Sequence, residues 1–327
     1  MSFTIVEEAT PRLNRSELAV PGSSLKFIEK APANAADVIF FDLEDSVAVD
    51  QKEQARRTVI AALNDLDFGD KTLSIRINGL DTPFMYRDVV DVVEQAGHRL
   101  DLIMIPKVGT AADVYALDML VTQIETAKGF RKRIGFELLI ETALGMQNIH
   151  AIAGASKRNE TLLLGTADFA ASTKARTTRI GGANPEYGML TDAAADGARA
   201  FHWGDMWHYA LARMVVAARA NGLRPVDGPF GDFKDEQGYL AAARRAASLG
   251  CEGKMVIHPS QITIANTLFS PSEAEITQAR RILDAMAAAE KAGAGAVSLE
   301  GKMIDIASIR QAQVVVKKAD MITAQHL

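Results

Sequence analysis

The stretch "FELLIETALG", residues 136–145, places a bare carboxylate at the end of an apolar run. Leu138, Leu139 and Ile140 lead directly into Glu141, and a turn of small residues follows. A charge at the end of a buried strand is costly unless it is paired, hydrated or bound to a cation. This stretch therefore predicts a buried strand whose end carries part of a polar site.

Apolar runs of the same kind recur along the chain and alternate with helical patterns. The runs that we expect to form strands are "SELAV" (16–20), "DVIFFDLE" (37–44), "TLSIRIN" (72–78), "LDLIMIPK" (100–107), "FELLIET" (136–142), "TLLLG" (161–165), "RPVDG" (224–228) and "GKMVIHP" (253–259). Between them lie helical segments such as 50–66, 110–129 and 235–250. In the first of these, apolar residues recur with the 3.6-residue period of a helix, at Ala55, Val59, Ala62, Leu63 and Leu66.

Strands that alternate with helices predict an α/β fold with a parallel sheet. Eight such units match a TIM (β/α)8 barrel, which we place in residues 1–269. The alternative is an open, doubly wound sheet. A dinucleotide-binding sheet of that kind would carry G-x-G-x-x-G after an early strand, and the sequence has no such turn there.

Two segments depart from the simple alternation. Residues 171–209 are rich in glycine, aspartate and aromatic residues and are too long for an ordinary strand–helix loop, so we expect a functional or interface insertion. Residues 270–327 open with Ser270, Pro271 and Glu273, a pattern typical of a helix N-terminus. We expect this tail to form a helical extension outside the barrel.

The composition favours a globular cytoplasmic protein. The chain has 327 residues, of which 48% are hydrophobic, and its net charge is −5. A nucleic-acid partner is not indicated, because no stripe of basic and aromatic residues is present. The single cysteine, Cys251, excludes an intramolecular disulfide. The N-terminal residues lack the apolar stretch of a signal peptide or anchor, and no run is long enough to span a membrane.

Polar residues gather where the predicted strands end, which in a TIM barrel is the edge that carries the chemistry. They are Asp42, Glu44, Asp45, Arg76, Asn78, Lys107, Glu141, Asp168 and His258. Glu141 and Asp168 end neighbouring strands, so their carboxylates can converge. Two carboxylates completed by water suit a hard cation such as Mg²⁺ or Mn²⁺. The alternative is that each acid caps a helix or pairs with an arginine.

Arg76 alternates with apolar neighbours, which predicts that its side chain points into the barrel and meets an anion there. That anion is either a substrate group or an acid of "DLED" (42–45), and the two roles are compatible. We interpret Lys107 as part of a barrel ion pair. His258 is either a general base or a hydrogen-bonded structural residue.

The segment after the first strand, "AVPGSSLKFIEKA" (19–31), combines small residues with lysines. Small residues allow a ligand to approach closely, and Ser24, Lys26 and Lys30 are candidates for binding phosphate groups. The alternative is a solvated helix surface.

Several longer stretches together resemble the citrate lyase β-subunit-like (HpcH/HpaI aldolase) family, and within it the malyl-CoA lyase branch. The matching stretches are "FFDLEDSVAVDQKEQAR", "IRINGLDTPFMYRD", "IPKVGTAADV", "IETALGM", "GTADFAAST", "GLRPVDGPFGDF", "GKMVIHPSQI" and "GKMIDIASIRQA". They lie between about residues 12 and 320, which is nearly the whole chain. "RPVDGPFGDF" and the insertion are similar to the malyl-CoA branch in particular.

The resemblance implies a TIM barrel with a C-terminal helical extension that packs on a neighbouring subunit of a trimer or hexamer. It implies reversible, Mg²⁺-dependent cleavage of (S)-malyl-CoA to acetyl-CoA and glyoxylate, with β-methylmalyl-CoA as a second substrate that gives propionyl-CoA. One-carbon or acetyl-CoA assimilation would use such a lyase.

The resemblance also implies roles for individual residues. Glu141 and Asp168 match the metal ligands, and Arg76 matches the arginine that stabilises the enolate oxyanion. The positions that match the coenzyme A and substrate contacts are Ser24, Lys30, Ala167, Ile257 and His258. Some relatives carry a basic residue at the position of Ser24, so nucleotide contacts are expected to shift to Lys26. Asp305 matches an acid that reaches a neighbouring subunit's site, and we expect it to transfer the proton.

Two other functions remain open at this point. The first is a malyl-CoA thioesterase, which would release malate and free coenzyme A from the same scaffold. The second is a subunit that acts on a carrier-bound acyl group, like the citrate lyase β chain.

The metal is expected to bind glyoxylate through its carbonyl oxygen and one carboxylate oxygen. Backbone N–H groups in "TALG" (142–145) and "GTAD" (165–168) are expected to bind the other carboxylate oxygen.

Overall fold

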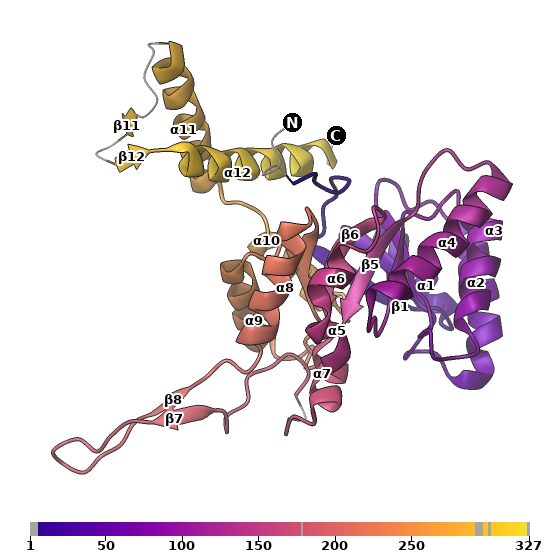
Figure 1. The fold of residues 1–327 in the computed structure, drawn as a ribbon, viewed down its shortest axis with the longest axis horizontal. Helices are drawn as coiled ribbons and strands as arrows, with labels where there is room; N and C mark the ends of the chain where they lie inside the picture. The colour runs from indigo at the N-terminus through magenta and orange to yellow at the C-terminus, as the bar shows by residue number, and fades with distance from the viewer. Residues whose placement is uncertain (1–5, 178, 292–296, 300–301, 326–327) are drawn as a thin grey trace. The chain divides into compact units, whose positions relative to one another are not determined.

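A closed barrel of eight parallel strands forms the centre of the fold (Figure 1). The computed structural model describes residues 6–177, 179–291, 297–299 and 302–325. The barrel order is β1-β10-β9-β6-β5-β4-β3-β2. The strands are β1 (Ser16–Pro21), β2 (Val38–Asp42), β3 (Thr72–Arg76), β4 (Leu102–Ile105), β5 (Gly135–Ile140), β6 (Asn159–Leu164), β9 (Arg224–Asp227) and β10 (Gly253–Val256). All eight strands expected from the sequence are present, and the predicted TIM-type barrel is confirmed.

An apolar layer fills the middle of the barrel. Its buried members come from six different strands: Phe40, Met104, Leu139, Leu163, Val226 and Met255. Side chains alternate between the two faces of a strand, so a residue two positions further on shares the interior face. Glu141 follows Leu139 by two residues, and Asp42 follows Phe40 by two. The next interior positions after the apolar layer are therefore acids on these two strands, and they form part of a polar rim at the carboxyl ends of the strands.

Helices between the strands surround the barrel (Figure 1). They are α1 (Leu25–Lys30), α2 (Lys52–Asp65), α3 (Met85–Ala96), α4 (Ala111–Lys128), α5 (Ala143–Gln147), α6 (Ile149–Ala153), α7 (Thr166–Thr173), α8 (His208–Ala220), α9 (Glu236–Leu249) and α10 (Ser260–Leu268). Single turns of 3-10 helix, Ala31–Ala33 and Val49–Gln51, lie beside α1 and α2. The two ends of α4 illustrate how local sequence sets where a helix begins and ends. Thr110 and Asp113 form a capping box, and Gly129 ends the helix with φ of 67°.

The insertion contains an antiparallel hairpin, β7 (Gly188–Leu190) and β8 (Phe201–Trp203). Every residue of both strands is exposed. Among its large apolar side chains, Met189 is 76% exposed and Trp203 is 70% exposed. A two-stranded hairpin is marginally stable alone, and exposed apolar clusters typically mark contact surfaces.

The chain divides into two compact units, Met1–Asn266 and Thr267–Leu327. The second unit consists of α11 (Glu273–Lys291), α12 (Ile306–Gln325) and a short hairpin, β11 (Val297–Leu299) with β12 (Lys302–Ile304). Its core is small and contains Met286, Ile304 and Ile309, with partly buried neighbours packed against them. The expected helices of the tail are present, together with a hairpin that the sequence analysis did not predict.

A buried polar layer lies at the opposite, amino-terminal end of the barrel interior. Glu17 and Glu137 have no exposed surface. The hydroxyl of Ser74 donates to Oε2 of Glu137 at 2.6 Å, and Nδ2 of Asn14 donates to Oε1 of Glu17 at 2.7 Å. The second carboxylate oxygen of each glutamate has no hydrogen-bond partner among the described residues. No pattern in the sequence predicted this layer.

Burial makes the ionised forms of these glutamates unfavourable. It raises the pKa of Glu137 to about 7 and raises the pKa of Glu17 well above its ordinary value, with the charge of Glu137 adding to the latter shift. The other charged groups that act on the pair are Arg12, Asp37, Glu160 and Arg224. The folded protein therefore holds protons here more tightly than the unfolded chain does.

We expect Glu137→Gln to flatten the dependence of stability on pH. A raised folded-state pKa gives stability that is complete below the unfolded pKa and is lost as pH rises through the folded value of about 7. Glutamine cannot ionise but still accepts the Ser74 hydrogen bond. Between about pH 5 and pH 8 the variant should lose up to about 3 kcal/mol less unfolding free energy than the wild type. Thermal unfolding followed by circular dichroism measures this, with the exposed Glu94→Gln as control. Parallel profiles for Glu137→Gln and wild type would contradict the expectation.

Candidate active site

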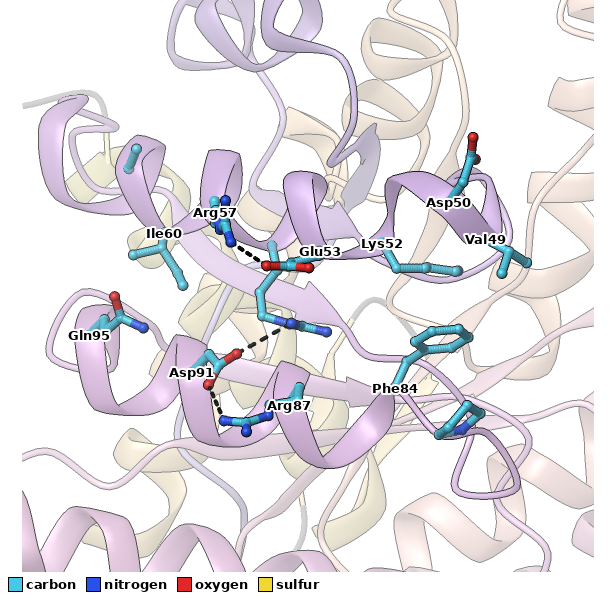
Figure 2. A pocket seen from close by; sticks show the side chains of 13 residues that line it. Val49, Asp50, Lys52, Glu53, Arg57, Ile60, Phe84, Arg87, Asp91 and Gln95 are labelled. Carbon is cyan, nitrogen blue, oxygen red and sulfur yellow. Dashed lines mark hydrogen bonds and ion pairs between the residues drawn. The ribbon is translucent and has the colours of Figure 1, made fainter.

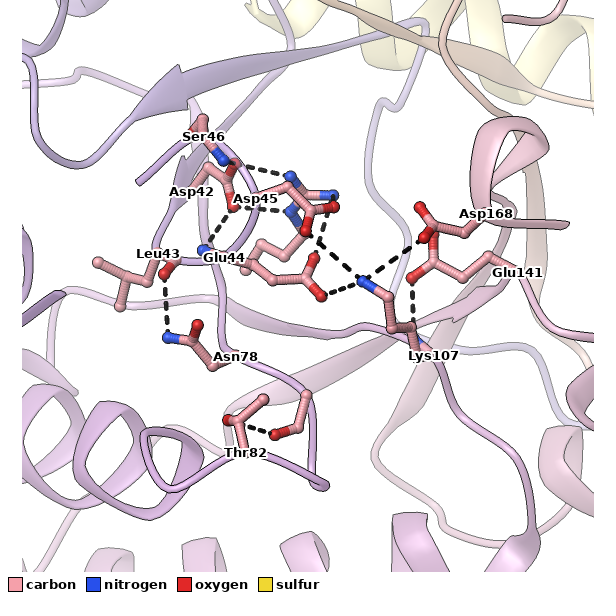
Figure 3. A network of polar contacts seen from close by, with 12 residues as sticks. Asp42, Leu43, Glu44, Asp45, Ser46, Asn78, Thr82, Lys107, Glu141 and Asp168 are labelled. Atoms are coloured by element: carbon pink, nitrogen blue, oxygen red, sulfur yellow. Dashed lines mark hydrogen bonds and ion pairs between the residues drawn. The ribbon is translucent and has the colours of Figure 1, made fainter. Parts of the chain in front are cut away.

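Glu141 and Asp168 lie at the carboxyl ends of neighbouring strands, as the sequence predicted. Glu141 directly follows β5, Asp168 lies in the first turn of α7 after β6, and the two strands pair with Ile140 opposite Leu164. Glu141 is only 2% exposed, whereas the Asp168 side chain is 37% exposed. The charge of Asp168 acts on Glu141, and Figure 3 shows the two carboxylates facing the same space.

The backbone around Glu141 fixes its carboxylate. The N–H of Lys107 donates to Oε1 of Glu141 at 2.9 Å. Oε2 lies over Gly165, where an added Cβ atom would come within 2.2 Å of it. Position 165 therefore requires glycine for a steric reason, and any larger residue there would displace the carboxylate.

The ammonium group of Lys107 lies between two sets of acids (Figure 3). Its Nζ is 2.5 Å from Oε1 of Glu44, 3.7 Å from Asp45 and 3.8 Å from Oδ1 of Asp168. Lys107 itself has φ of 52°, which is uncommon for a residue with a side chain. The predicted ion pairing of Lys107 is confirmed, and the structure adds that it joins the "DLED" segment to Asp168.

Arg76 is held by Asp42 through two parallel hydrogen bonds. Its Nε and Nη2 donate to the two carboxylate oxygens of Asp42 at 2.7 and 2.6 Å. Nη1 lies 3.4 Å from Glu44, and the arginine side chain is 14% exposed. This bidentate pairing confirms that an acid of "DLED" partners Arg76 and fixes the direction of the guanidinium. Asn78, by contrast, donates to Asp88 and to the Leu43 carbonyl and has a structural role.

The electrostatics of the rim follow from burial and close charges. Burial raises the pKa of Glu141 to about 8, and the carboxylates of Glu44 and Asp168 add to the rise. Burial alone would lower the pKa of Lys107, but its hydrogen bond to Glu44 and the surrounding acids raise it. The pKa of Arg76 is likewise raised, because the Asp42 carboxylate outweighs the cost of burial. Both cations therefore stay charged at neutral pH.

The donor set at this rim fits a hard divalent cation. Glu141 and Asp168 supply carboxylate oxygens, and a positive group, the Lys107 ammonium, already lies beside Asp168. Among the described residues no cluster of three or more His, Cys, Asp or Glu side chains has the arrangement of a metal cage. The protein would therefore provide two oxygens and leave further positions to water and substrate, as Mg²⁺ sites commonly do.

The residues predicted to contact coenzyme A and the substrate also lie after barrel strands. Ser24 precedes α1, and Lys26 and Lys30 are exposed on that helix, which follows β1. Ala167 is exposed beside Asp168.

Two further predicted residues follow β10. Ile257 is 40% exposed, and His258 is exposed as well. The His258 ring stacks on Phe233 with centroids 4.6 Å apart, and its Nδ1 lies 2.9 Å from the hydroxyl of Ser260. These contacts hold the imidazole in place at the strand end.

Asp305 lies in the second unit, immediately before α12. Its Oδ1 accepts hydrogen bonds from the N–H of Ser308 at 2.9 Å and from the Ser308 hydroxyl at 3.0 Å. These bonds are those of a helix N-cap, and the bond from the Ser308 backbone lowers the pKa of Asp305. Its expected role in proton transfer stays a prediction.

Three of the eight backbone amides proposed for the substrate carboxylate are engaged elsewhere. In "TALG" the N–H of Ala143 donates to the Ser172 hydroxyl, and the N–H of Gly145 donates to the hydroxyl of Thr142, both at 2.9 Å. In "GTAD" the N–H of Gly165 donates to the Ile140 carbonyl at 3.1 Å. Our expectation was wrong for these three amides, because helix capping and the β5–β6 ladder use them.

A hollow of about 870 Å³ lies on the outside of the barrel between α2 and α3 (Figure 2). Its cations are already paired: Arg57 contacts Glu53, and both Arg56 and Arg87 contact Asp91. None of the rim acids lines it. The rim, and not this hollow, is therefore the candidate active site.

A closed parallel barrel with convergent acids and a fixed arginine at its carboxyl rim defines a TIM-barrel enzyme. Within the described residues no helix is long and apolar enough to cross a membrane. The model of the HpcH/HpaI aldolase/citrate lyase family matches residues 15–259, and the chain belongs to this family.

Individual proteins of known name show which members of the family this chain is similar to. The chain is 55% identical over 324 residues to the L-malyl-CoA/beta-methylmalyl-CoA lyase of Cereibacter sphaeroides, covering 99% of this chain and 100% of that protein. It is 44% identical to the malyl-CoA/beta-methylmalyl-CoA/citramalyl-CoA lyase of Chloroflexus aurantiacus, over 89% of this chain and 82% of that protein. Among solved structures, CitE of Mycobacterium tuberculosis in complex with magnesium, acetoacetate and coenzyme A matches with a TM-score of 0.67 and 27% identity, over 93% of this chain and 97% of that chain.

Proposed function

We propose that this protein is a carbon–carbon lyase that reversibly cleaves (S)-malyl-CoA to acetyl-CoA and glyoxylate. β-Methylmalyl-CoA, which gives propionyl-CoA and glyoxylate, is the proposed second substrate. The observation that carries the proposal is the 55% identity over essentially the full length of both chains to a lyase of that name. The geometry of the rim supports it, because one edge of the barrel holds the acids and a half-buried arginine that Asp42 fixes in place.

The proposed cofactor is Mg²⁺, with Mn²⁺ as the alternative, held by Glu141 and Asp168. A bound divalent ion would supply Lewis-acid polarisation of the α-oxo acid. The related structure that contains magnesium supports this assignment. The protein's own part is to hold the Glu141 carboxylate at a fixed position through the Lys107 N–H and the space above Gly165.

Arg76 is proposed to stabilise the negative charge that forms on the thioester. In the cleavage direction a base takes the proton of the malyl hydroxyl, the carbon–carbon bond breaks to release glyoxylate, and the electron pair moves onto the thioester as an enolate. A proton is then added to the enolate carbon, which gives acetyl-CoA. In the condensing direction the enolate forms when a proton leaves the acetyl methyl group. A guanidinium already oriented by Asp42 faces this charge without having to reorganise. We assign the proton transfers to Asp305.

Coenzyme A is proposed to bind along α1 and the neighbouring strand ends. Ser24, Lys26 and Lys30 would contact the nucleotide and its phosphates, because exposed lysines at a strand end can approach them. Ala167, Ile257 and His258 would line the acyl pocket. Their exposure in the single chain is consistent with this role.

The protein is further proposed to act as a homo-oligomer, a trimer or hexamer, in which the helical extension packs on a neighbouring subunit. The exposed apolar side chains of the β7–β8 hairpin support association, because such clusters are rarely left in contact with water. A cytoplasmic location and a role in one-carbon assimilation complete the proposal.

We expect the purified chain to release glyoxylate from malyl-CoA and to lose at least about 99% of that activity in EDTA, with recovery on adding Mg²⁺. Removing the ion takes away charge stabilisation worth several kcal/mol, which is the reason for so large a loss. Glyoxylate is measured as its phenylhydrazone, and free coenzyme A is measured with a thiol reagent in the same samples.

The same assay separates the competing functions. Free coenzyme A and malate without glyoxylate would identify a thioesterase and overturn the proposal. Activity only on a carrier-bound acyl group would identify a citrate lyase β-type subunit. Full glyoxylate release in EDTA, with the metal content verified, would remove the metal from the mechanism and leave the lyase assignment standing.

A further inference from the structure

We propose that Lys107 is a positioning residue that acts as a stand-in cation: in the metal-free enzyme its ammonium holds the rim acids together, and it yields Asp168 to the divalent ion when that ion binds. This inference rests on the proposed function, because it assumes that the ion binds at Glu141 and Asp168. The inference describes what Lys107 and the neighbouring acids do in the metal-free and in the metal-bound enzyme.

The first support is that Lys107 contacts both halves of the acid cluster. Through Nζ it reaches Glu44 at 2.5 Å on one side and Asp168 at 3.8 Å on the other. Through its backbone N–H it reaches Glu141 at 2.9 Å. One residue thus touches both proposed metal ligands, one through the main chain and the other through the side chain (Figure 3).

The second support is the backbone conformation. Lys107 has φ of 52°, in the left-handed region that residues with a Cβ atom rarely adopt. Such a conformation persists only where the surroundings impose it, and it occurs preferentially at functional sites. Here it lets the N–H of Lys107 reach Glu141 while its side chain reaches Asp168.

The third support is the balance of charge. The rim gathers four carboxylates within ion-pair distance of two cations, Arg76 and Lys107. The acids are Asp42, Glu44, Asp45 and Asp168. Without a metal the Lys107 ammonium is the cation beside Asp168, and a divalent ion at that place would repel it. The Lys107 ammonium also has a shorter contact with Glu44, and it can keep this partner when Asp168 binds the ion.

The decisive measurement is the affinity for Mg²⁺ itself, determined by isothermal titration calorimetry on the purified protein without substrate. Lys107→Met keeps the length and the Cβ atom but removes the charge that the ion must displace. We expect its Kd for Mg²⁺ to be about tenfold tighter than that of the wild type. Lys107→Arg, which restores the charge, should return to within about threefold of the wild type. Lys132→Met removes a lysine that pairs with Asp101 away from the rim, and it should bind as the wild type does.

Thermal unfolding provides a second readout that a purely structural lysine would not give. In EDTA the Lys107→Met variant should unfold about 2–4 °C below the wild type, because its acids lose their cation. At saturating Mg²⁺ that deficit should shrink to less than about 1 °C, because the ion replaces the ammonium. If the methionine variant does not fold, Lys107→Gln, which keeps a polar end near Glu44, takes its place.

The outcomes separate the two proposals. If the wild type binds Mg²⁺ but Lys107→Met binds it equally or more weakly, the stand-in role is overturned and the metal site stands. A deficit in unfolding temperature that is the same in EDTA and in Mg²⁺ also overturns it, since it would show an ordinary structural ion pair. If the wild type shows neither binding heat nor a stability gain with Mg²⁺, the metal site fails and the Lys107 proposal fails with it.

Discussion

Glu141→Gln is expected to abolish measurable Mg²⁺ binding and to lower kcat/KM for malyl-CoA cleavage by at least about 10³-fold. The carboxylate is 2% exposed and held by the Lys107 N–H, so its position leaves little freedom for a substitute ligand. A neutral amide gives up the charge that attracts a hard cation. Asp168→Asn should have an effect of the same order, because the site then also retains one carboxylate.

The fold should survive the first of these changes. Glutamine still accepts the hydrogen bond from Lys107, and it removes a buried charge whose ionisation is unfavourable. We therefore expect an unfolding temperature in EDTA equal to or above that of the wild type. The control is Asp50→Asn, an exposed acid outside the rim, which should keep full activity. Retained Mg²⁺-dependent turnover in Glu141→Gln would refute the ligand assignment.

Arg76→Met and Asp305→Asn are each expected to lower kcat by about 10³-fold, and mixed oligomers of the two variants are expected to regain activity. The first variant loses the guanidinium that faces the enolate, and the second loses the proposed acid/base. If each active site takes Arg76 from one subunit and Asp305 from its neighbour, some mixed sites contain both intact residues. Random association of equal amounts would make such sites about a quarter of the total.

The measurement is steady-state cleavage after the variants are mixed, dissociated and reassociated. Each variant alone, treated in the same way, gives the baseline. Arg57→Met and Asp320→Asn, which alter exposed charges in the same units as Arg76 and Asp305 respectively, are the matched controls. Reassociation that leaves activity at the baseline would refute a shared site. Unchanged kcat in Asp305→Asn would refute the catalytic role of that residue altogether.

The periodicity of the sequence was sufficient to predict the barrel. Most of its strands are short apolar runs bounded by polar or small residues, and such a local signal survives without tertiary context. Glu141 and Asp168 could be placed on one rim for the same reason, since the carboxyl ends of parallel barrel strands share an edge. Ala167, Ile257 and Asp305 were predicted only by the resemblance of long stretches to a known family.

Two features could not be predicted in this way. One is the hydrogen bonding of the "TALG" amides, and the other is the burial of two glutamates at the amino-terminal end of the barrel interior. Whether an N–H is free depends on a partner such as Ser172, which lies 29 positions from Ala143. Glu17 and Glu137 read as ordinary polar positions within strands, because alternation does not indicate which layer of a closed barrel is sealed from water.

From the sequence alone one can predict the order of the barrel strands and of the helices between them, the polar residues that follow those strands, and the family. Which charges meet depends on how the barrel closes: Lys107 joins Glu44, 63 positions away, to Asp168, and Arg76 pairs with Asp42, 34 positions away. These residues lie at or just after the ends of β2, β3, β4 and β6, which barrel closure brings together. Coulomb interactions depend on that distance in space and not on separation along the chain.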